Sequence, residues 1–179
     1  MLVKIVIGCA FAGQMVAAGV GQRGDSYSSA YTSLNKPPCR LQSLQVEGAN
    51  SQLSCPGVHG YRLLLLDSDG RMSVTVVSPR GSRHPLDFWE TVTANFSSVG
   101  DRAEWRIRQR GSEAAPVAVI VPLKINDDPE SSKATSYLVV ARIDPGKVCA
   151  VGKFKDDADG RTQARSTADA AIELKCLTQ

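Results

Sequence analysis

The sequence contains little of what nucleic-acid-binding proteins require. Its formal net charge is +3 and aromatic residues make up only 6% of the chain. A nearly neutral chain has no dense basic face for a nucleic-acid backbone, and few aromatics provide few platforms on which bases or sugars can stack. We therefore expect no nucleic-acid partner.

Recognisable catalytic motifs are also lacking. General acid–base chemistry most often recruits histidine, and the only two histidines, His59 and His84, lie in segments rich in Gly and Pro. The chain has neither a Gly-x-Ser-x-Gly elbow nor a His-Glu-x-x-His motif. This favours a non-enzymatic protein. The alternative is a small periplasmic hydrolase-like enzyme, in which a deep pocket would place a loop histidine against a carboxylate.

No metal or cofactor is expected. The cysteines lack the close Cys-x-x-Cys spacing of zinc sites. Residues 67–70 and 157–160 resemble fragments of a calcium loop, but the second would place Lys155 at the first ligand position and Ser166 at the last. We interpret the first segment as a hairpin tip and the second as a helix start capped by Asp159.

Apolar runs of the length that spans a bilayer, about 20 residues, are missing. The N-terminal run over residues 5–18 is shorter, follows a single charge at Lys4 and ends in small side chains, as secretory signals do. We predict a signal peptide over residues 1–18 and a periplasmic or secreted protein without a transmembrane segment in the mature chain. A start codon further upstream would make Cys9 an alternative lipidation site.

The remaining four cysteines are an even number in a chain predicted to fold in an oxidising compartment. They allow three pairings. Cys39 and Cys55 flank an apparent hairpin, whereas Cys149 begins a strand and Cys176 follows the last helical segment. We predict the disulfides Cys39–Cys55 and Cys149–Cys176, the second of which would hold the helix against the sheet.

Strand periodicity dominates the middle of the chain. Residues 61–66 and 72–77 surround an Asp-rich turn with Gly70 and form the clearest hairpin. Residues 86–100 fit a short helix or an ordered loop equally well, and residues 161–174 show Ala-rich helical spacing. We predict a flexible tether over 19–30 and a single α+β domain over 31–179. Its fold would be one antiparallel sheet of about six to eight strands with a C-terminal α-helix packed on it.

Three arginines alternate along one predicted strand and form the sharpest local pattern. Trp105 and Ile107 would point inward, which leaves Arg106, Arg108 and Arg110 on the outer face. Guanidinium groups in such a row suit phosphates or carboxylates. A solvated edge strand, protected from aggregation by its charge, is the alternative.

Two turns beside predicted strand ends form a second candidate. Residues 59–61, which include His59 and Tyr61, and residues 79–81 lie where binding loops are often carried. They are interpreted first as turns and second as a ligand rim.

Short blocks along the chain resemble a family of small secreted proteobacterial proteins of unassigned function with two predicted disulfides. The blocks are Tyr31-Thr32-Ser33-Leu34, Cys55-Pro56-Gly57, Gly60-Tyr61, Glu104-Trp105-Arg106, Val148-Cys149, Ala164-Arg165, Ala168-Asp169 and Cys176. The resemblance extends over about residues 31–176, departs from the family pattern at residues 85–89, and implies a periplasmic location and the two disulfides. It implies no catalytic residue.

These observations favour an exported, non-enzymatic binding or inhibitor-like module. Its expected partner is an anionic envelope component or a periplasmic protein.

Overall fold

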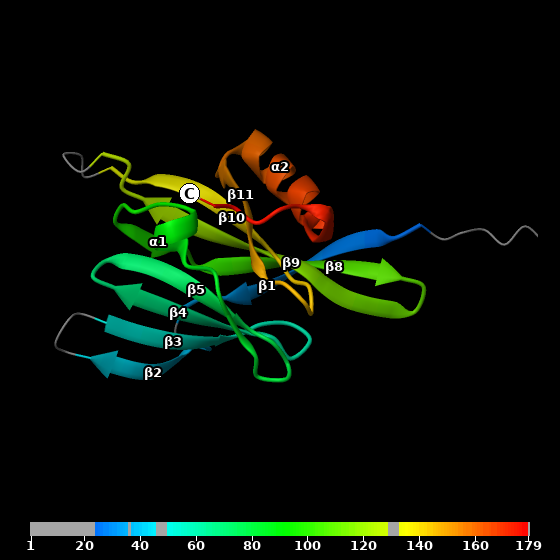
Figure 1. The fold of residues 1–179 in the computed structure, drawn as a ribbon, viewed down its shortest axis with the longest axis horizontal. Helices are drawn as coiled ribbons and strands as arrows, with labels where there is room; N and C mark the ends of the chain where they lie inside the picture. The colour runs from blue at the N-terminus through cyan, green and yellow to red at the C-terminus, as the bar shows by residue number, and fades with distance from the viewer. Residues whose placement is uncertain (1–23, 36, 46–49, 129–132, 179) are drawn as a thin grey trace, which may run out of the picture.

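Strands account for most of the described chain in a computed structural model that describes residues 24–35, 37–45, 50–128 and 133–178 (Figure 1). The predicted signal peptide, residues 1–18, lies outside these residues. The strands are β1 (Ser26–Ser33), β2 (Arg40–Gln45), β3 (Asn50–Pro56), β4 (Arg62–Ser68), β5 (Arg71–Val77), β6 (Arg83–Pro85), β7 (Ser97–Val99), β8 (Arg102–Arg110), β9 (Glu113–Ile125), β10 (Thr135–Arg142) and β11 (Cys149–Lys155). The helical segments are α1 (Phe88–Thr91), α2 (Ala158–Asp169) and the 3-10 turn η1 (Ala171–Glu173).

All eleven described strands belong to one sheet, which is larger than the sequence predicted and not wholly antiparallel. Its path runs β1-β8-β9-β7-β5-β4-β3-β2, with β10 and β11 continuing from β9 and β6 paired with β5. Strands β5 and β7 pair in parallel, whereas the other pairs are antiparallel. The prediction of an α+β fold with a closing C-terminal helix is confirmed in outline, and the size and the purely antiparallel pairing were wrong.

Strand β9 has a core on each face. Its residues Val119 and Val121 pack with side chains from β4, β5 and β8 in the larger cluster. Ala118 and Ile120, which alternate with these valines along the strand, pack with β10, β11 and helix α2 in the smaller cluster. A strand buried on both faces needs an unbroken apolar run instead of an alternating one, which explains why residues 117–121 are all apolar. The molecule therefore has three layers, with β8–β11 between strands β2–β5 and helix α2.

The hairpin β4–β5 is confirmed. Ser68 pairs with Arg71, and the two turn residues between them, Asp69 and Gly70, have φ of 52° and 70°. Positive φ at both positions defines the tight turn whose twist matches the flanking strands, and Asp-Gly is among its preferred sequences.

The two helical segments differ in extent from their predictions. Residues 86–100 contain the single helical turn α1 and the short strand β7, so neither a helix nor a loop describes the whole segment. Helix α2 begins and ends earlier than the predicted 161–174. Its N-cap is Asp157, whose Oδ1 accepts from the Gly160 amide at 2.8 Å, and not the predicted Asp159.

Both predicted disulfides are present. Cys39 is bonded to Cys55 and Cys149 to Cys176. Beyond Cys176 the chain returns to the sheet, where the Leu177 amide donates to the Ala150 carbonyl at 2.8 Å. The C-terminus is thus attached to β11 by a covalent bond and a backbone hydrogen bond.

The predicted tether over residues 19–30 was wrong for its last part. Residues 26–30 belong to β1, which pairs with β8 from Ser26↔Gln109 to Ser33↔Arg102. Its Ser- and Tyr-rich composition offers little to bury, but backbone pairing and polar contacts to β8 hold it. Within the described ranges, no helix has the length and apolar character needed to cross a membrane.

Gly160 allows helix α2 to approach the chain that leads into it. A Cβ at this position would lie 1.8 Å from the Lys155 carbonyl oxygen. We expect Gly160→Ala to lower the free energy of unfolding by about 2 kcal/mol in urea titrations, because the backbone must shift to relieve the overlap. Thr162→Ala, on the exposed side of the same helix, should be neutral or slightly stabilising. Equal stability of the two variants would contradict this role of Gly160.

Candidate binding groove between the sheet and helix α2

The row of outward-facing arginines predicted on β8 does not exist in that form. Trp105 and Ile107 face the larger core as expected, but Arg106 is only 9% exposed. The prediction assumed one buried face, whereas α2 covers the other face of β8 at this point. The expectation that Arg106 is outside the core was therefore wrong.

Arg106 holds helix α2 to the sheet. Its Nε and Nη2 donate to the two carboxylate oxygens of Asp169 on α2 at 2.7 and 2.9 Å. Its Nη1 also donates to Ser29 Oγ on β1 and lies 3.8 Å from Glu104 Oε1. A bidentate arginine–carboxylate pair is among the strongest ionic contacts in proteins. Arg106 therefore joins β1, β8 and α2 and has a structural role.

The other two arginines of the row, Arg108 and Arg110, lie near Asp25, which directly precedes β1. Arg110 Nη2 lies 2.8 Å from Asp25 Oδ2, and Arg108 Nε lies 3.9 Å from the same oxygen. The hydrogen bond from Arg110 lowers the pKa of Asp25 below its usual value. These arginines fasten the start of β1, and they do not form a free cationic surface.

The predicted loop rim is brought together only in part. Tyr61, Arg80, His84 and Asp144 line a pocket of about 350 Å³, and burial raises the pKa of Tyr61. His59 lies apart from this lining, exposed at a turn with φ of 49°. Within the described residues, no hydrogen bond or ion pair joins His84 to a carboxylate. A loop histidine held against a carboxylate, the arrangement that would favour a hydrolase-like enzyme, is therefore not found among the described residues.

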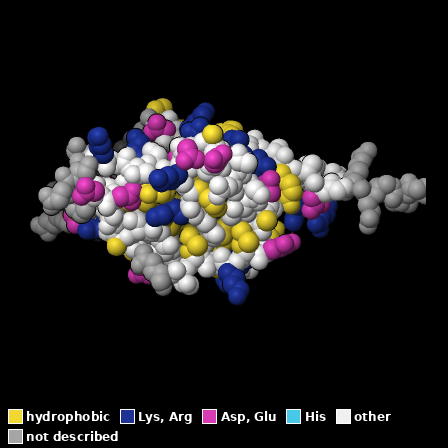
Figure 2. Space-filling view, turned by 90° about the horizontal axis from the view of Figure 1, so that it is seen from above, with side chains coloured by type: hydrophobic (Ala, Val, Ile, Leu, Met, Phe, Trp, Pro, Cys, Tyr) yellow, Lys and Arg dark blue, Asp and Glu magenta, His cyan; other side chains and the backbone are white. Residues whose placement is uncertain are grey.

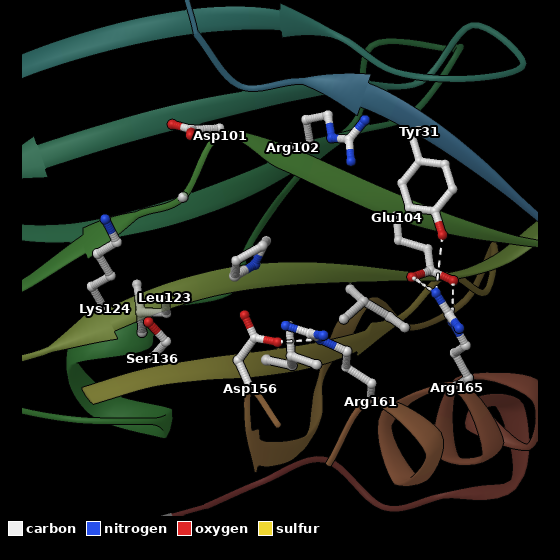
Figure 3. Close-up of a pocket in the computed structure, with 14 residues that line it drawn as sticks. Tyr31, Asp101, Arg102, Glu104, Leu123, Lys124, Ser136, Asp156, Arg161 and Arg165 are labelled. Atoms are coloured by element: carbon white, nitrogen blue, oxygen red, sulfur yellow. Dashed lines mark hydrogen bonds and ion pairs between the residues drawn. The ribbon is translucent and has the colours of Figure 1, made fainter. Parts of the chain in front are cut away.

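A larger groove lies between the sheet and helix α2 (Figure 3), with a volume of about 490 Å³. Its apolar floor comes from β9 and β10. Its polar side chains include Tyr31 on β1, Asp101, Arg102 and Glu104 at the start of β8, Lys124 on β9, and two arginines of α2. In Figure 3, Lys124 lies at one end of the groove and Arg165 at the other.

One end of the groove is an ion-pair cluster with fixed geometry. Arg165 Nε and Nη2 donate to the two oxygens of Glu104 at 2.8 and 3.1 Å, and Nη2 also donates to the Tyr31 hydroxyl at 3.0 Å. Ser29 donates to the same carboxylate. Arg161, one helical turn earlier, pairs with Asp156 at 2.6 Å.

This cluster shifts the titration of Glu104. Burial raises its pKa, but the hydrogen bonds from Arg165 and Ser29 outweigh burial and hold the pKa below its usual value. A carboxyl whose pKa falls on folding stabilises the fold above the unfolded pKa, and it loses this contribution as pH falls through the lowered value. Glu104 therefore remains ionised, and Arg165 held in place, at neutral pH.

The two remaining cations of the groove lie outside these ion pairs, Lys124 at the other end and Arg102 beside Tyr31 (Figure 3). Arg102 and Lys124 are both exposed, and in the described part of the chain neither pairs with a carboxylate. The Arg102 guanidinium lies 5.4 Å from the centre of the Tyr31 ring, within cation–π range. The nearby Asp101 accepts a hydrogen bond from Asn35 at 2.8 Å.

The groove lining contains four cationic and three acidic side chains. Figure 2, which views the molecule from above, shows basic and acidic side chains interspersed on that face, without one extended field of a single sign. The excess of positive charge is local to the groove. It suits a single anionic group better than a densely charged polymer such as a nucleic acid.

Comparisons with known proteins leave the chain without an assigned relative. No protein-family model, no curated protein and no solved structure matches it. The chemistry of the groove is therefore the basis on which a function can be proposed.

Proposed function

We propose that this protein is an exported, non-enzymatic binding module that takes an anionic group of an envelope component into the groove between the sheet and α2. The observation that carries the proposal is the pair Arg102 and Lys124, which are exposed and have no acidic partner within the described residues. Their charge is available to a ligand, whereas the other cations of the groove already pair with acids.

The paired end of the groove supports the same proposal. Arg165 is held by Glu104 and Tyr31, and Arg161 by Asp156, so these side chains lose little conformational freedom when a ligand arrives. A guanidinium has five N–H donors and the pairs use only some of them. Carboxylates and phosphates are the groups that such donors recognise.

The disulfides support the compartment of this proposal. Two disulfide bonds indicate an oxidising, extracellular or periplasmic environment. The proposed signal peptide over residues 1–18 and the resemblance to small secreted proteobacterial proteins support the periplasm as the site of action. An envelope polymer that carries carboxylates or phosphates is present there as a ligand of the right chemistry.

Charge reversal in the groove tests the proposal. The double variant Arg102→Glu/Lys124→Glu should bind glucuronic acid, a carboxylate, or glucose 6-phosphate at least about tenfold more weakly than the wild type. The two probes distinguish a carboxylate from a phosphate ligand. Binding by the wild type should also fall as salt rises toward physiological strength, since exposed charges are screened over about 10 Å at 0.1 M. Isothermal titration calorimetry measures both effects.

A matched control reverses the same number of positive charges at positions outside the groove. Arg62 and Arg83 are exposed and lie on β4 and β6, on either side of Val77 on β5. The variant Arg62→Glu/Arg83→Glu should bind like the wild type, as should His59→Ala and His84→Ala. Equal losses in the two double variants would show that only net charge matters, and retained binding in the groove variant would exclude the groove.

A further inference from the structure

A second depression lies on the face of β2–β4 that points away from the larger core. It has a volume of about 350 Å³ and is lined by Trp89, Leu66, Asn50, Gln52, Ser43 and Ser68, together with Ser51. The register places Gln52 opposite Leu66 and Ser43, and Asn50 opposite Ser68. Directly paired residues share a face of the sheet, so these side chains form one continuous patch.

The lining differs from that of the groove because none of the side chains that line it carries a charge. It combines one half-buried tryptophan and one leucine with amide and hydroxyl groups. An anion would find no cation here, and a purely apolar ligand would bury these amides and hydroxyls without partners. A ligand that suits this lining must have both an apolar face and many neutral hydroxyl groups.

Asn50 supplies an independent observation. Its Oδ1 is the one buried side-chain nitrogen or oxygen atom that, among the described residues, has no hydrogen-bond partner. Buried acceptors in native proteins are nearly always satisfied by protein, water or ligand. Because Asn50 lines the depression, this acceptor becomes available to a donor such as a ligand hydroxyl when the side chain turns into the depression.

We propose that this depression binds a neutral sugar residue of an oligosaccharide. The C–H face of the sugar ring packs on Trp89, because the face of an aromatic ring is negative and C–H groups are weakly positive. Leu66 extends the apolar surface. Asn50 accepts from a sugar hydroxyl, and Gln52 and the serines provide further donors and acceptors. The scarcity of aromatics in the sequence does not exclude such a site, since one platform is enough for one sugar ring.

Tryptophan fluorescence offers a direct assay, because the chain has two tryptophans and only one lies at this site. Trp105 is 0% exposed in the larger core and reports folding. Titration of the full mature protein with neutral hexasaccharides of glucose, mannose and galactose should give a saturable change in the emission of Trp89 with at least one of them. In Trp89→Phe the remaining Trp105 emission should not respond to sugar.

Two substitutions locate the site. Trp89→Ala should weaken binding at least about tenfold by calorimetry, while near-ultraviolet circular dichroism of Trp105 shows that the fold is kept. Asn50→Ala should also weaken binding without lowering the unfolding midpoint, because it removes an unsatisfied acceptor. Phe96→Ala, an exposed aromatic outside this lining, should bind sugar like the wild type.

Two measurements distinguish sugar binding at this depression from anion binding in the groove. Arg102→Glu/Lys124→Glu should leave sugar binding unchanged, and binding of the neutral hexasaccharide should not fall with salt. The proposal is overturned if no neutral hexasaccharide binds the wild type, or if Trp89→Ala and Asn50→Ala both bind as tightly as the wild type. Loss of sugar binding in the groove variant would also overturn it and would place the sugar in the groove instead.

Discussion

Replacing Asp169 by alanine is expected to lower the free energy of unfolding by about 3 kcal/mol or more. The substitution removes the two carboxylate oxygens that accept from Nε and Nη2 of Arg106, whose side chain is only 11% exposed. A buried charge without its partner must be dehydrated without compensation, which costs more than the pair contributes. Amides of helix α2 should also become less protected, since Arg106–Asp169 is one of two ion pairs that join α2 to β8, beside Arg165–Glu104. Chemical denaturation and amide exchange along α2 measure the two effects.

Two control variants separate burial from ion pairing as such. Asp25→Ala removes a pair with Arg110, whose side chain is 66% exposed, and should lower the free energy of unfolding far less than Asp169→Ala does. The double variant Arg106→Met/Asp169→Ala should recover much of the lost stability, because it leaves no unpaired charge in the interface. If Asp169→Ala is as mild as Asp25→Ala, the pair does not hold the helix.

Loss of the C-terminal disulfide is expected to have a similarly large effect. Cys149 and Cys176 are 27 residues apart, and releasing a loop of this size costs about 3 kcal/mol in the chain-entropy model. The double variant Cys149→Ser/Cys176→Ser avoids a free thiol. Its unfolding midpoint, compared with that of the wild type under non-reducing conditions, gives the effect.

Hydrogen bonds from Arg142 to the segment that precedes Cys176 increase the stability loss expected when this disulfide is removed. Arg142 is 7% exposed, and its Nη1 donates to the carbonyls of Ile172 and Leu174 at 3.2 and 3.0 Å. Without the disulfide these carbonyls can move away and leave the buried guanidinium underbonded. Amide exchange should therefore increase from η1 to Leu177 first. Unchanged protection there would show that side-chain packing alone holds the C-terminus.

The sequence predicted features that local patterns determine. The hairpin at Asp69-Gly70 follows from the preference of that dipeptide for positive φ. The two disulfides could be predicted because each cysteine lies near the end of a predicted element. Pairing cysteines of neighbouring elements brings the sulfurs together without an unusual backbone path. Such signals do not depend on which distant segments meet.

The burial of Arg106 and the groove could not be predicted because both depend on distant segments. Tyr31, Glu104 and Arg165 meet across separations of 61 and 134 residues, and no local pattern links them. One signal was present. Small residues such as Ala118, Ala164 and Ala168 mark the second face of β9 and the facing side of α2, and they permit the close approach that buries Arg106.

The place of β1 in the sheet has a consequence for the order of folding. Strands β2 to β5 join neighbours in the sequence through short connections, whereas Ser29 on β1 meets Arg106 on β8, which lies 77 residues further along the chain. Pairings of long sequence separation carry the entropy of closing the intervening loop and form late. As the chain is synthesised, the first described strand has no partner until most of the sheet has been made. We therefore expect β1 to dock onto a preformed sheet, which makes it one of the last strands to find its place although it is the first in the described sequence.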